Sequence, residues 1–131
     1  MKLGIIGVGG IGETTAPTLA AMEEIECYAV ASRTLERAQN FAAKHGFEKA
    51  YGSYEELLGD PEVELVYVAT PHSHHYEHMM MSLERGKPVI CEKAFTMNAA
   101  QAKRVAEFAR EKGLFAAEAI WPRYMPSRAI I

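Results

Sequence analysis

The chain opens on Lys2-Leu-Gly-Ile-Ile-Gly-Val-Gly-Gly-Ile-Gly12, an apolar run that leads directly into a glycine-rich turn. The run over residues 2–7 is typical of a strand buried on both faces, and we expect a helix from about residue 10 to residue 24. Glycines in such a turn can adopt backbone conformations that other residues disfavour. The stretch therefore predicts a tight strand-turn-helix unit at the start of the fold.

Gly7, Gly9 and Gly12 have the Gly-x-Gly-x-x-Gly spacing of a dinucleotide-binding turn. Gly7 permits the tight turn, Gly9 lets the backbone approach a pyrophosphate, and Gly12 lets the helix pack closely on the strand. Free N–H groups at the helix N-terminus, which includes Gly10 and Ile11, favour the phosphates. Because the motif lies between a strand and a helix, dinucleotide binding is preferred to a flexible loop. The absence of a following Gly-Lys-Ser/Thr excludes a triphosphatase loop.

Short apolar runs alternate with helical patterns along the rest of the chain, which predicts right-handed crossovers and a doubly wound α/β fold of the Rossmann type. Thr34 offers a hydroxyl N-cap, as does Ser53, while Asn98 with Gln101 opens a later helix. The expected strands cover residues 2–7, 26–31, 49–51, 63–69, 88–92 and 114–119. The expected helices cover about residues 10–24, 35–45, 53–60, 73–85 and 98–112.

Composition narrows the class of protein. The 131 residues are 49% hydrophobic and carry a net charge of -3 without a basic stripe, so a nucleic-acid partner is not expected. No segment is long and apolar enough for a membrane span, and the start lacks a secretory signal pattern, so we expect a cytoplasmic protein with no membrane partner. Cys27 and Cys91 lie in strand-like runs and are interpreted as core residues rather than as a disulfide or metal pair.

The residues after the second strand address the identity of the dinucleotide. An NAD-binding unit carries a carboxylate there for the ribose hydroxyls, whereas this chain has Ser32, Arg33 and Thr34. A guanidinium can pair with the 2′-phosphate of NADP, so we predict NADP, with NAD as the alternative. Arg37, one turn into the helix, can assist Arg33, although a surface role is preferred for it. The competing interpretation is that Thr34 only caps the helix and both arginines are surface charges.

With these residues in hand, the whole chain resembles the N-terminal domain of the Gfo/Idh/MocA oxidoreductase family. The resemblance rests on the glycine turn, on Ala69-Thr-Pro-His-Ser-His-His75 and on Cys91-Glu-Lys93. The segment Glu118-Ala-Ile-Trp-Pro-Arg-Tyr124 resembles the branch of dihydrodiol dehydrogenases and NADP-dependent xylose dehydrogenases, which again favours NADP.

The resemblance implies roles for individual residues. Lys93 would be the catalytic residue, hydrogen-bonding the reacting hydroxyl, and Glu92 would hold the nicotinamide ribose. Trp121 and Arg123 would close over the cofactor, and His75 would line the cleft. The candidate cofactor-binding residues are Gly7, Gly9, Gly10, Ile11, Gly12, Ser32, Arg33, Thr34, Arg37, Thr70, Pro71, His72, His75, Glu92, Lys93, Trp121 and Arg123.

Two departures from the family pattern affect the site. The family usually has proline after its lysine, which helps to fix the backbone there, whereas this chain has Ala94, so the aim of Lys93 is left open. The smaller departure is His72, where the family commonly has Asn.

His74 and His78 have a helical spacing that can bind zinc. No Cys or Asp completes a ligand set, and a helix carrying surface and cleft histidines is the preferred interpretation, so we expect no metal.

We expect residues 1–120 to form the dinucleotide-binding domain and residues 121–131 to begin the helix that links it to a second α/β substrate domain. That second domain is absent from this chain, so we expect cofactor binding with little turnover, and an exposed face that makes homo-oligomers plausible. One hypothesis is the cofactor domain of a dehydrogenase acting on a sugar, polyol or dihydrodiol. The alternative is a stand-alone, non-catalytic NADP(H)-binding or regulatory module.

Overall fold

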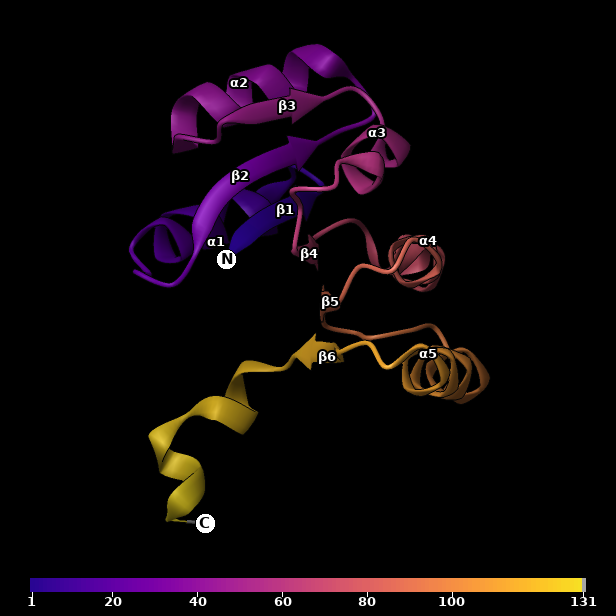
Figure 1. The fold of residues 1–131 in the computed structure, drawn as a ribbon. Coiled ribbons are helices and arrows are strands. Elements are labelled where there is room, and N and C mark those ends of the chain that lie inside the picture. Colours follow the sequence, from indigo (N-terminus) through magenta and orange to yellow (C-terminus); the bar gives the residue numbers. More distant parts are fainter. Residues whose placement is uncertain (131) are drawn as a thin grey trace.

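The computed structural model describes residues 1–130 as a six-stranded sheet between two layers of helices (Figure 1). The strands are β1 (Lys2–Ile6), β2 (Glu26–Ala31), β3 (Lys49–Tyr51), β4 (Leu65–Val68), β5 (Val89–Glu92) and β6 (Ala116–Ala119). The helices are α1 (Gly10–Ala20), α2 (Leu35–His45), α3 (Tyr54–Gly59), α4 (His75–Glu84) and α5 (Ala99–Lys112). The single-turn 3-10 helices are η1 (His72–His74), η2 (Trp121–Tyr124) and η3 (Pro126–Ala129).

All strand pairs are parallel, and the strand order is β3-β2-β1-β4-β5-β6. This order confirms the predicted doubly wound Rossmann fold. The direction of winding reverses between β1 and β4, so the chain leaves these neighbouring strands toward opposite faces of the sheet. Open parallel sheets bind ligands at the carboxyl ends of the strands at this point. The fold thus fixes where a site can form.

The two faces of β1 seed two cores, because successive side chains of a strand point to opposite faces. Leu3 and Ile5 pack in a cluster with Phe41 of α2, under α1 and α2. Ile6 packs on the other face in a cluster with Leu57 of α3, which α4 and α5 extend. Gly4 faces this second layer, where a Cβ would come within 2.9 Å of Leu57. A strand buried on both faces is therefore confirmed.

The helix caps test the sequence-based boundaries. Ser53 Oγ accepts a hydrogen bond from the Glu56 backbone at 3.2 Å, and Asn98 Oδ1 accepts one from the Gln101 backbone at 2.9 Å, as predicted. Thr34 occupies the N-cap position of α2, but its side chain makes no capping hydrogen bond, so that part of the prediction was wrong. Its backbone nevertheless has the extended conformation of a cap.

Several elements are shorter than the apolar pattern predicted. The first helix ends at Ala20 rather than near Glu24, because the next N–H groups bond three residues back, from Met22 to the Leu19 carbonyl at 3.1 Å. The fourth strand begins at Leu65, since the Val63 backbone turns back to the Asp60 carbonyl. The helix expected from residue 73 is split into η1 and α4.

The carboxyl-terminal segment extends away from the sheet (Figure 1). It consists of η2 and η3, and Trp121 and Tyr124 are 65% and 67% exposed there. Ile131, the last residue of the predicted linker, lies outside the described residues. Across residues 1–130 no helix has both the length and the apolarity to cross a bilayer.

Asp60, in the turn between α3 and β4, links that turn to β2 and β3 through hydrogen bonds. Its carboxylate accepts hydrogen bonds from the hydroxyls of Tyr51 at 2.7 Å and Tyr28 at 2.9 Å, and from the Glu62 backbone at 2.9 Å. The Lys87 ammonium donates to the Asp60 carbonyl at 2.7 Å. Burial alone would raise the pKa of the Asp60 carboxyl, but the three hydrogen bonds outweigh it and hold the pKa below its ordinary value.

We expect Asp60→Asn to lower the free energy of unfolding by about 1–2 kcal/mol at neutral pH, because its amide places an NH2 group where two hydroxyls donate. The folded-state pKa of Asp60 lies below its ordinary value of 3.8, so its contribution is present above that pH and is lost as pH falls through the folded value. Urea unfolding at neutral pH and at about pH 3 measures the free energy of unfolding of both proteins. The difference between the unmodified chain and Asp60→Asn should be smaller at about pH 3.

Glu84→Gln, at an exposed carboxylate on α4, is the matched control and should change stability little at either pH. A deficit for Asp60→Asn of equal size at both pH values would contradict the role assigned to the carboxylate.

Candidate functional site

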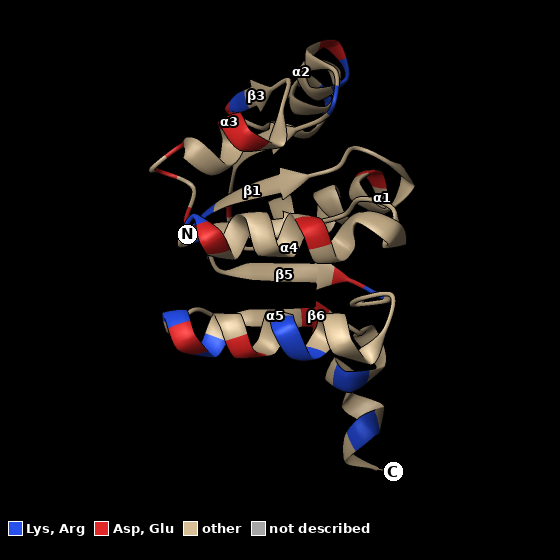
Figure 2. Cartoon of the chain, turned by 90° about the vertical axis from the view of Figure 1, so that its right-hand side faces the viewer, with Lys and Arg blue, Asp and Glu red and all other residues tan. Residues whose placement is uncertain are grey.

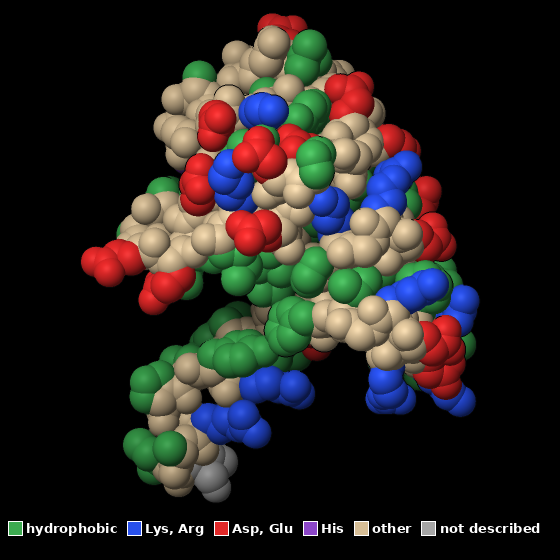
Figure 3. All heavy atoms as spheres, in the orientation of Figure 1, with side chains coloured by type: hydrophobic (Ala, Val, Ile, Leu, Met, Phe, Trp, Pro, Cys, Tyr) green, Lys and Arg blue, Asp and Glu red, His purple; other side chains and the backbone are tan. Residues whose placement is uncertain are grey.

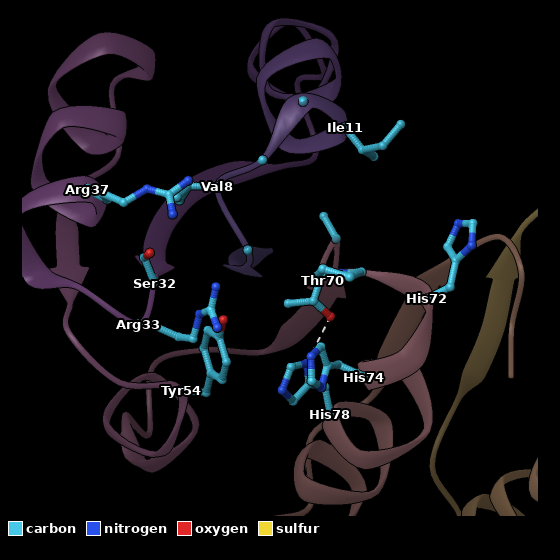
Figure 4. Close-up of a pocket in the computed structure, with 15 residues that line it drawn as sticks. Val8, Ile11, Ser32, Arg33, Arg37, Tyr54, Thr70, His72, His74 and His78 are labelled. Carbon is cyan, nitrogen blue, oxygen red and sulfur yellow. Dashed lines mark hydrogen bonds between the residues drawn. The ribbon is translucent and has the colours of Figure 1, made fainter. Parts of the chain in front are cut away.

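A cavity of about 380 Å³ lies at the carboxyl ends of β1, β2 and β4 (Figure 4). The turns that follow these three strands supply most of its wall, and α3 contributes Tyr54. The residues that line it are Gly7, Val8, Gly9, Gly10, Ile11, Ser32, Arg33, Arg37, Tyr54, Ala69, Thr70, Pro71, His72, His74 and His78. Its position is the one that the reversal of strand order dictates.

The glycine-rich turn forms one wall and brings three backbone constraints together. Gly7 has φ +104, and a Cβ there would meet the Ala69 carbonyl oxygen at 2.7 Å. A Cβ on Gly12 would meet the Gly7 carbonyl oxygen at 2.9 Å, so the first turn of α1 lies directly on the strand end. Gly9 is the N-cap of α1 and has open space where a Cβ would stand. The turn is therefore tight on its inner side and open toward the cavity.

The end of β2 gives the cavity its charge. Ser32 is buried, and its backbone N–H donates to the Tyr51 carbonyl at 3.2 Å. Arg33 and Arg37 are exposed, and Figure 4 shows the guanidinium of Arg37 near Val8 and that of Arg33 near Tyr54. Among the lining residues of the described chain there is no carboxylate. The cavity is therefore suited to an anionic group at this end.

Histidines and a tyrosine form the opposite wall. The Thr70 hydroxyl and His78 Nδ1 share a hydrogen bond of 2.8 Å, and the Tyr54 ring meets the His78 ring edge-on with centroids 4.7 Å apart. His74 stacks on His78 at 5.6 Å. Burial lowers the pKa of His78, which favours a neutral ring. The three rings thus pack against one another in this wall.

Sequence reasoning did not place Tyr54 in the cleft. For His74 and His78 it preferred surface and cleft histidines of a helix to a metal pair, without assigning either residue to the cofactor site. Within residues 1–130 no group of three potential ligands from His, Cys, Asp and Glu is assembled. The signal that was missed is their position directly after β4, at the ligand-binding edge.

His75 is expected in the cleft, but its side chain lies behind the wall. The ring is fully buried, with Nε2 2.8 Å from the Thr70 carbonyl and Nδ1 2.7 Å from the Ala94 carbonyl. It therefore joins the loop after β4 to the turn after β5.

The turn after β5 carries Glu92 and Lys93 at the same edge of the sheet. The Tyr67 hydroxyl donates to Glu92 Oε1, and the Lys93 backbone N–H donates to Glu92 Oε2 at 3.3 Å. Burial and then the Glu92 carboxylate raise the pKa of Tyr67, so this hydroxyl keeps its proton. Lys93 is exposed, and the Lys93–Ala94 peptide bond is cis. The carboxylate is thus held while the lysine remains accessible.

The structure divides the predicted cofactor-binding residues into two groups. Those that line the cavity are Gly7, Gly9, Gly10, Ile11, Ser32, Arg33, Arg37, Thr70, Pro71 and His72. Those outside its lining are Gly12, Thr34, His75, Glu92, Lys93, Trp121 and Arg123. Gly12 and His75 support the wall from behind, whereas Glu92 and Lys93 lie on the neighbouring strand end.

The sequence of the chain is similar to a family of oxidoreductases and to two dehydrogenases of known activity. A family model described as "Oxidoreductase family, NAD-binding Rossmann fold" (GFO_IDH_MocA) matches residues 1–119. The chain is 47% identical over 138 residues to D-xylose 1-dehydrogenase (NADP(+)) of Hypocrea jecorina, covering 96% of this chain and 35% of that protein. It is 45% identical over 129 residues to trans-1,2-dihydrobenzene-1,2-diol dehydrogenase of Macaca fascicularis, covering 97% and 39%.

A solved structure agrees with the fold. The crystal structure of KijD10, a 3-ketoreductase from Actinomadura kijaniata in complex with NADP, superposes with a TM-score of 0.94 and 34% identity. The match covers 99% of this chain and 42% of KijD10. The chain thus spans between 35% and 42% of the length of these three proteins.

The glycine turn makes a prediction about stability. Gly7→Ala should lower the free energy of unfolding by about 1–3 kcal/mol, because the new Cβ meets a carbonyl oxygen in a left-handed backbone conformation. Gly9→Ala should change it by less than about 0.5 kcal/mol, because its Cβ enters open space. Urea unfolding of both variants measures the contrast, and equal losses at the two positions would contradict the geometry described.

Proposed function

This chain belongs to the Gfo/Idh/MocA family of oxidoreductases, and from that premise we propose that it binds NADP(H) as the cofactor domain of a dehydrogenase. The proposed substrates are secondary hydroxyls of sugars, polyols or dihydrodiols, in line with the relatives named for D-xylose and trans-dihydrobenzenediol. The preference for NADP(H) is carried by one observation, which is the pair of arginines at the end of β2 in a cavity wall without a carboxylate.

The pyrophosphate of the cofactor would lie against the first turn of α1. Gly9 leaves space for a close approach, and the N–H groups that begin α1 have no intrahelical partner, so they can donate to phosphate oxygens. The helix dipole adds a partial positive charge at the same place. This support applies equally to NAD and NADP.

The adenosine end separates the two dinucleotides. Arg33 and Arg37 can each donate to a 2′-phosphate from a rigid guanidinium, and the Ser32 hydroxyl lies between them in the wall (Figure 4). The aromatic wall of Tyr54, His74 and His78 offers its faces to the adenine. NAD lacks the 2′-phosphate and would leave both guanidinium groups unpaired.

The reacting end would lie at the turn after β5. Glu92, oriented by the Tyr67 hydroxyl, would accept hydrogen bonds from the nicotinamide ribose. The exposed Lys93 ammonium would donate a hydrogen bond to the reacting oxygen and share in moving its proton. The bound cofactor supplies or accepts the hydride. Trp121 and Arg123, exposed on η2 after β6, would close over the cofactor.

Titration of NADPH and NADH into the chain tests the cofactor assignment. We expect the chain to bind NADPH more tightly than NADH. Arg33→Ala and Arg37→Ala should each lower the affinity for NADPH by about tenfold, because each removes a charge-assisted hydrogen bond. NADH affinity should change by less than about twofold in the same variants, since no phosphate contact is lost.

Arg110→Ala on α5 is the matched control, because it removes an exposed arginine from an element that contributes nothing to the cavity lining. It should leave both affinities unchanged. Equal affinities for NADPH and NADH in the unmodified chain would overturn the assignment to NADP(H).

A further inference from the structure

We infer that His75 is a positioning residue for Lys93: its buried ring, in contact with one backbone carbonyl of each of two loops, fixes the lysine-bearing turn to the wall of the cofactor cavity. The inference rests on the proposed function, because the aim of Lys93 matters only if a nicotinamide cofactor binds beside it. It assigns a role to a buried side chain that touches neither cofactor nor substrate.

Both partners of the His75 ring are backbone carbonyls. Nδ1 lies 2.7 Å from the Ala94 oxygen and Nε2 lies 2.8 Å from the Thr70 oxygen, and the residue is fully buried. A carbonyl oxygen only accepts, so a ring nitrogen that carries hydrogen donates to its carbonyl at either position. The buried ring thus lies between two backbone acceptors on two different loops.

The position of the ring in the fold explains what it can join. His75 is the first residue of α4. The His72 ring meets the His75 ring edge-on, with centroids 5.4 Å apart. The two acceptors belong to loops that follow different strands, β4 and β5. One ring thus joins two loops that have no backbone ladder between them at this level.

The turn that carries Lys93 depends on such side-chain contacts. Residues 93–98 lie between β5 and α5 and belong to no helix or strand. The Ala94 carbonyl bonds to His75, and the Phe95 backbone N–H donates to Glu118 Oε1 of β6 at 2.9 Å. Ala94 has no pyrrolidine ring to restrict its own backbone, so these two contacts from flanking elements restrain the turn.

The same ring relates Lys93 to the cofactor wall. Thr70 lines the cavity and is held twice, through its carbonyl by His75 and through its hydroxyl by His78. The Ala94 carbonyl is therefore kept at a fixed distance from a residue of the cofactor wall. Loss of one hydrogen bond at His75 would free the lysine turn while leaving the glycine turn and Arg33 in place.

The first experiment observes the hydrogen bond of the ring directly. Nitrogen-15 NMR of the histidine-labelled chain at neutral pH should show a His75 ring N–H whose hydrogen exchanges slowly with solvent, assigned by comparison with a His75→Gln sample. A His75 ring N–H that exchanges as fast as that of the exposed His74 would overturn the inference, whether or not any variant folds.

The second experiment reports the position of Lys93 without turnover. Periodate converts the nicotinamide ribose of NADP to a dialdehyde, because the 2′-phosphate protects the other ribose. An amine beside it forms an imine with loss of water, and cyanoborohydride reduces the imine to a stable secondary amine. At saturating reagent, peptide mass spectrometry should find this label on Lys93 in the unmodified chain.

We expect His75→Phe, which keeps a ring but has no N–H donors, to slow labelling of Lys93 by about tenfold, because a displacement of about 1 Å strongly reduces such a reaction. His75→Gln keeps a donor for one carbonyl, so its rate of Lys93 labelling should lie between those of the unmodified chain and His75→Phe. It replaces the Phe variant in the test if that variant does not fold. His45→Phe is the control, at a half-buried histidine on α2 that pairs with Glu13. It should label at the unmodified rate.

The outcomes separate the two proposals. Labelling of Lys93 at equal rates in the unmodified chain and in the folded His75 variants would overturn the positioning role. Failure of the unmodified chain to bind NADPH would instead overturn the proposed function, and the NMR measurement would still decide whether the His75 ring is hydrogen-bonded.

Discussion

The close contact between Gly7 and the Ala69 carbonyl is the constraint on which the site depends. A Cβ at Gly7 would stand 2.7 Å from that oxygen, so the turn after β1 reaches the end of β4 only with glycine there. This contact lies where the strand order reverses, and it directs the N-terminus of α1 into the cavity. The position of the α1 N-terminus at the cavity follows from the packing of two strand ends.

The polar groups at the amino ends of the strands differ in their partners from those at the carboxyl ends. Near the amino ends of β1 and β4, polar groups satisfy one another, as Asp60 does with two tyrosines and Lys87 does with two carbonyls. At the carboxyl edge, the first turn of α1 and the two arginines line the cavity. Figure 2 shows acidic residues on α4 and residues of both charges along α5, and Figure 3 shows a hollow between the carboxyl-terminal segment and the rest of the molecule.

Much of the fold could be predicted because local patterns and global packing agree. The alternation of apolar runs located all six strands, and Gly46 and Gly113 end α2 and α5 in the left-handed conformation that such glycines favour. The end of α1 could not be predicted, because the apolar pattern continues past Ala20 while the backbone tightens into a turn. Residues that meet only in three dimensions were also missed, such as Tyr54 beside His78. Likewise, no local pattern tells that His75 is turned away from the cavity toward two carbonyls.

A crystal structure of the chain with NADP bound tests the central claim most directly, which is that the carboxyl edge at the reversal point is built for this dinucleotide. The account predicts the pyrophosphate against the backbone of Gly9 and Gly10, and the 2′-phosphate between Arg33 and Arg37. A dinucleotide bound elsewhere on the sheet, or a 2′-phosphate directed into solvent away from both arginines, would contradict it.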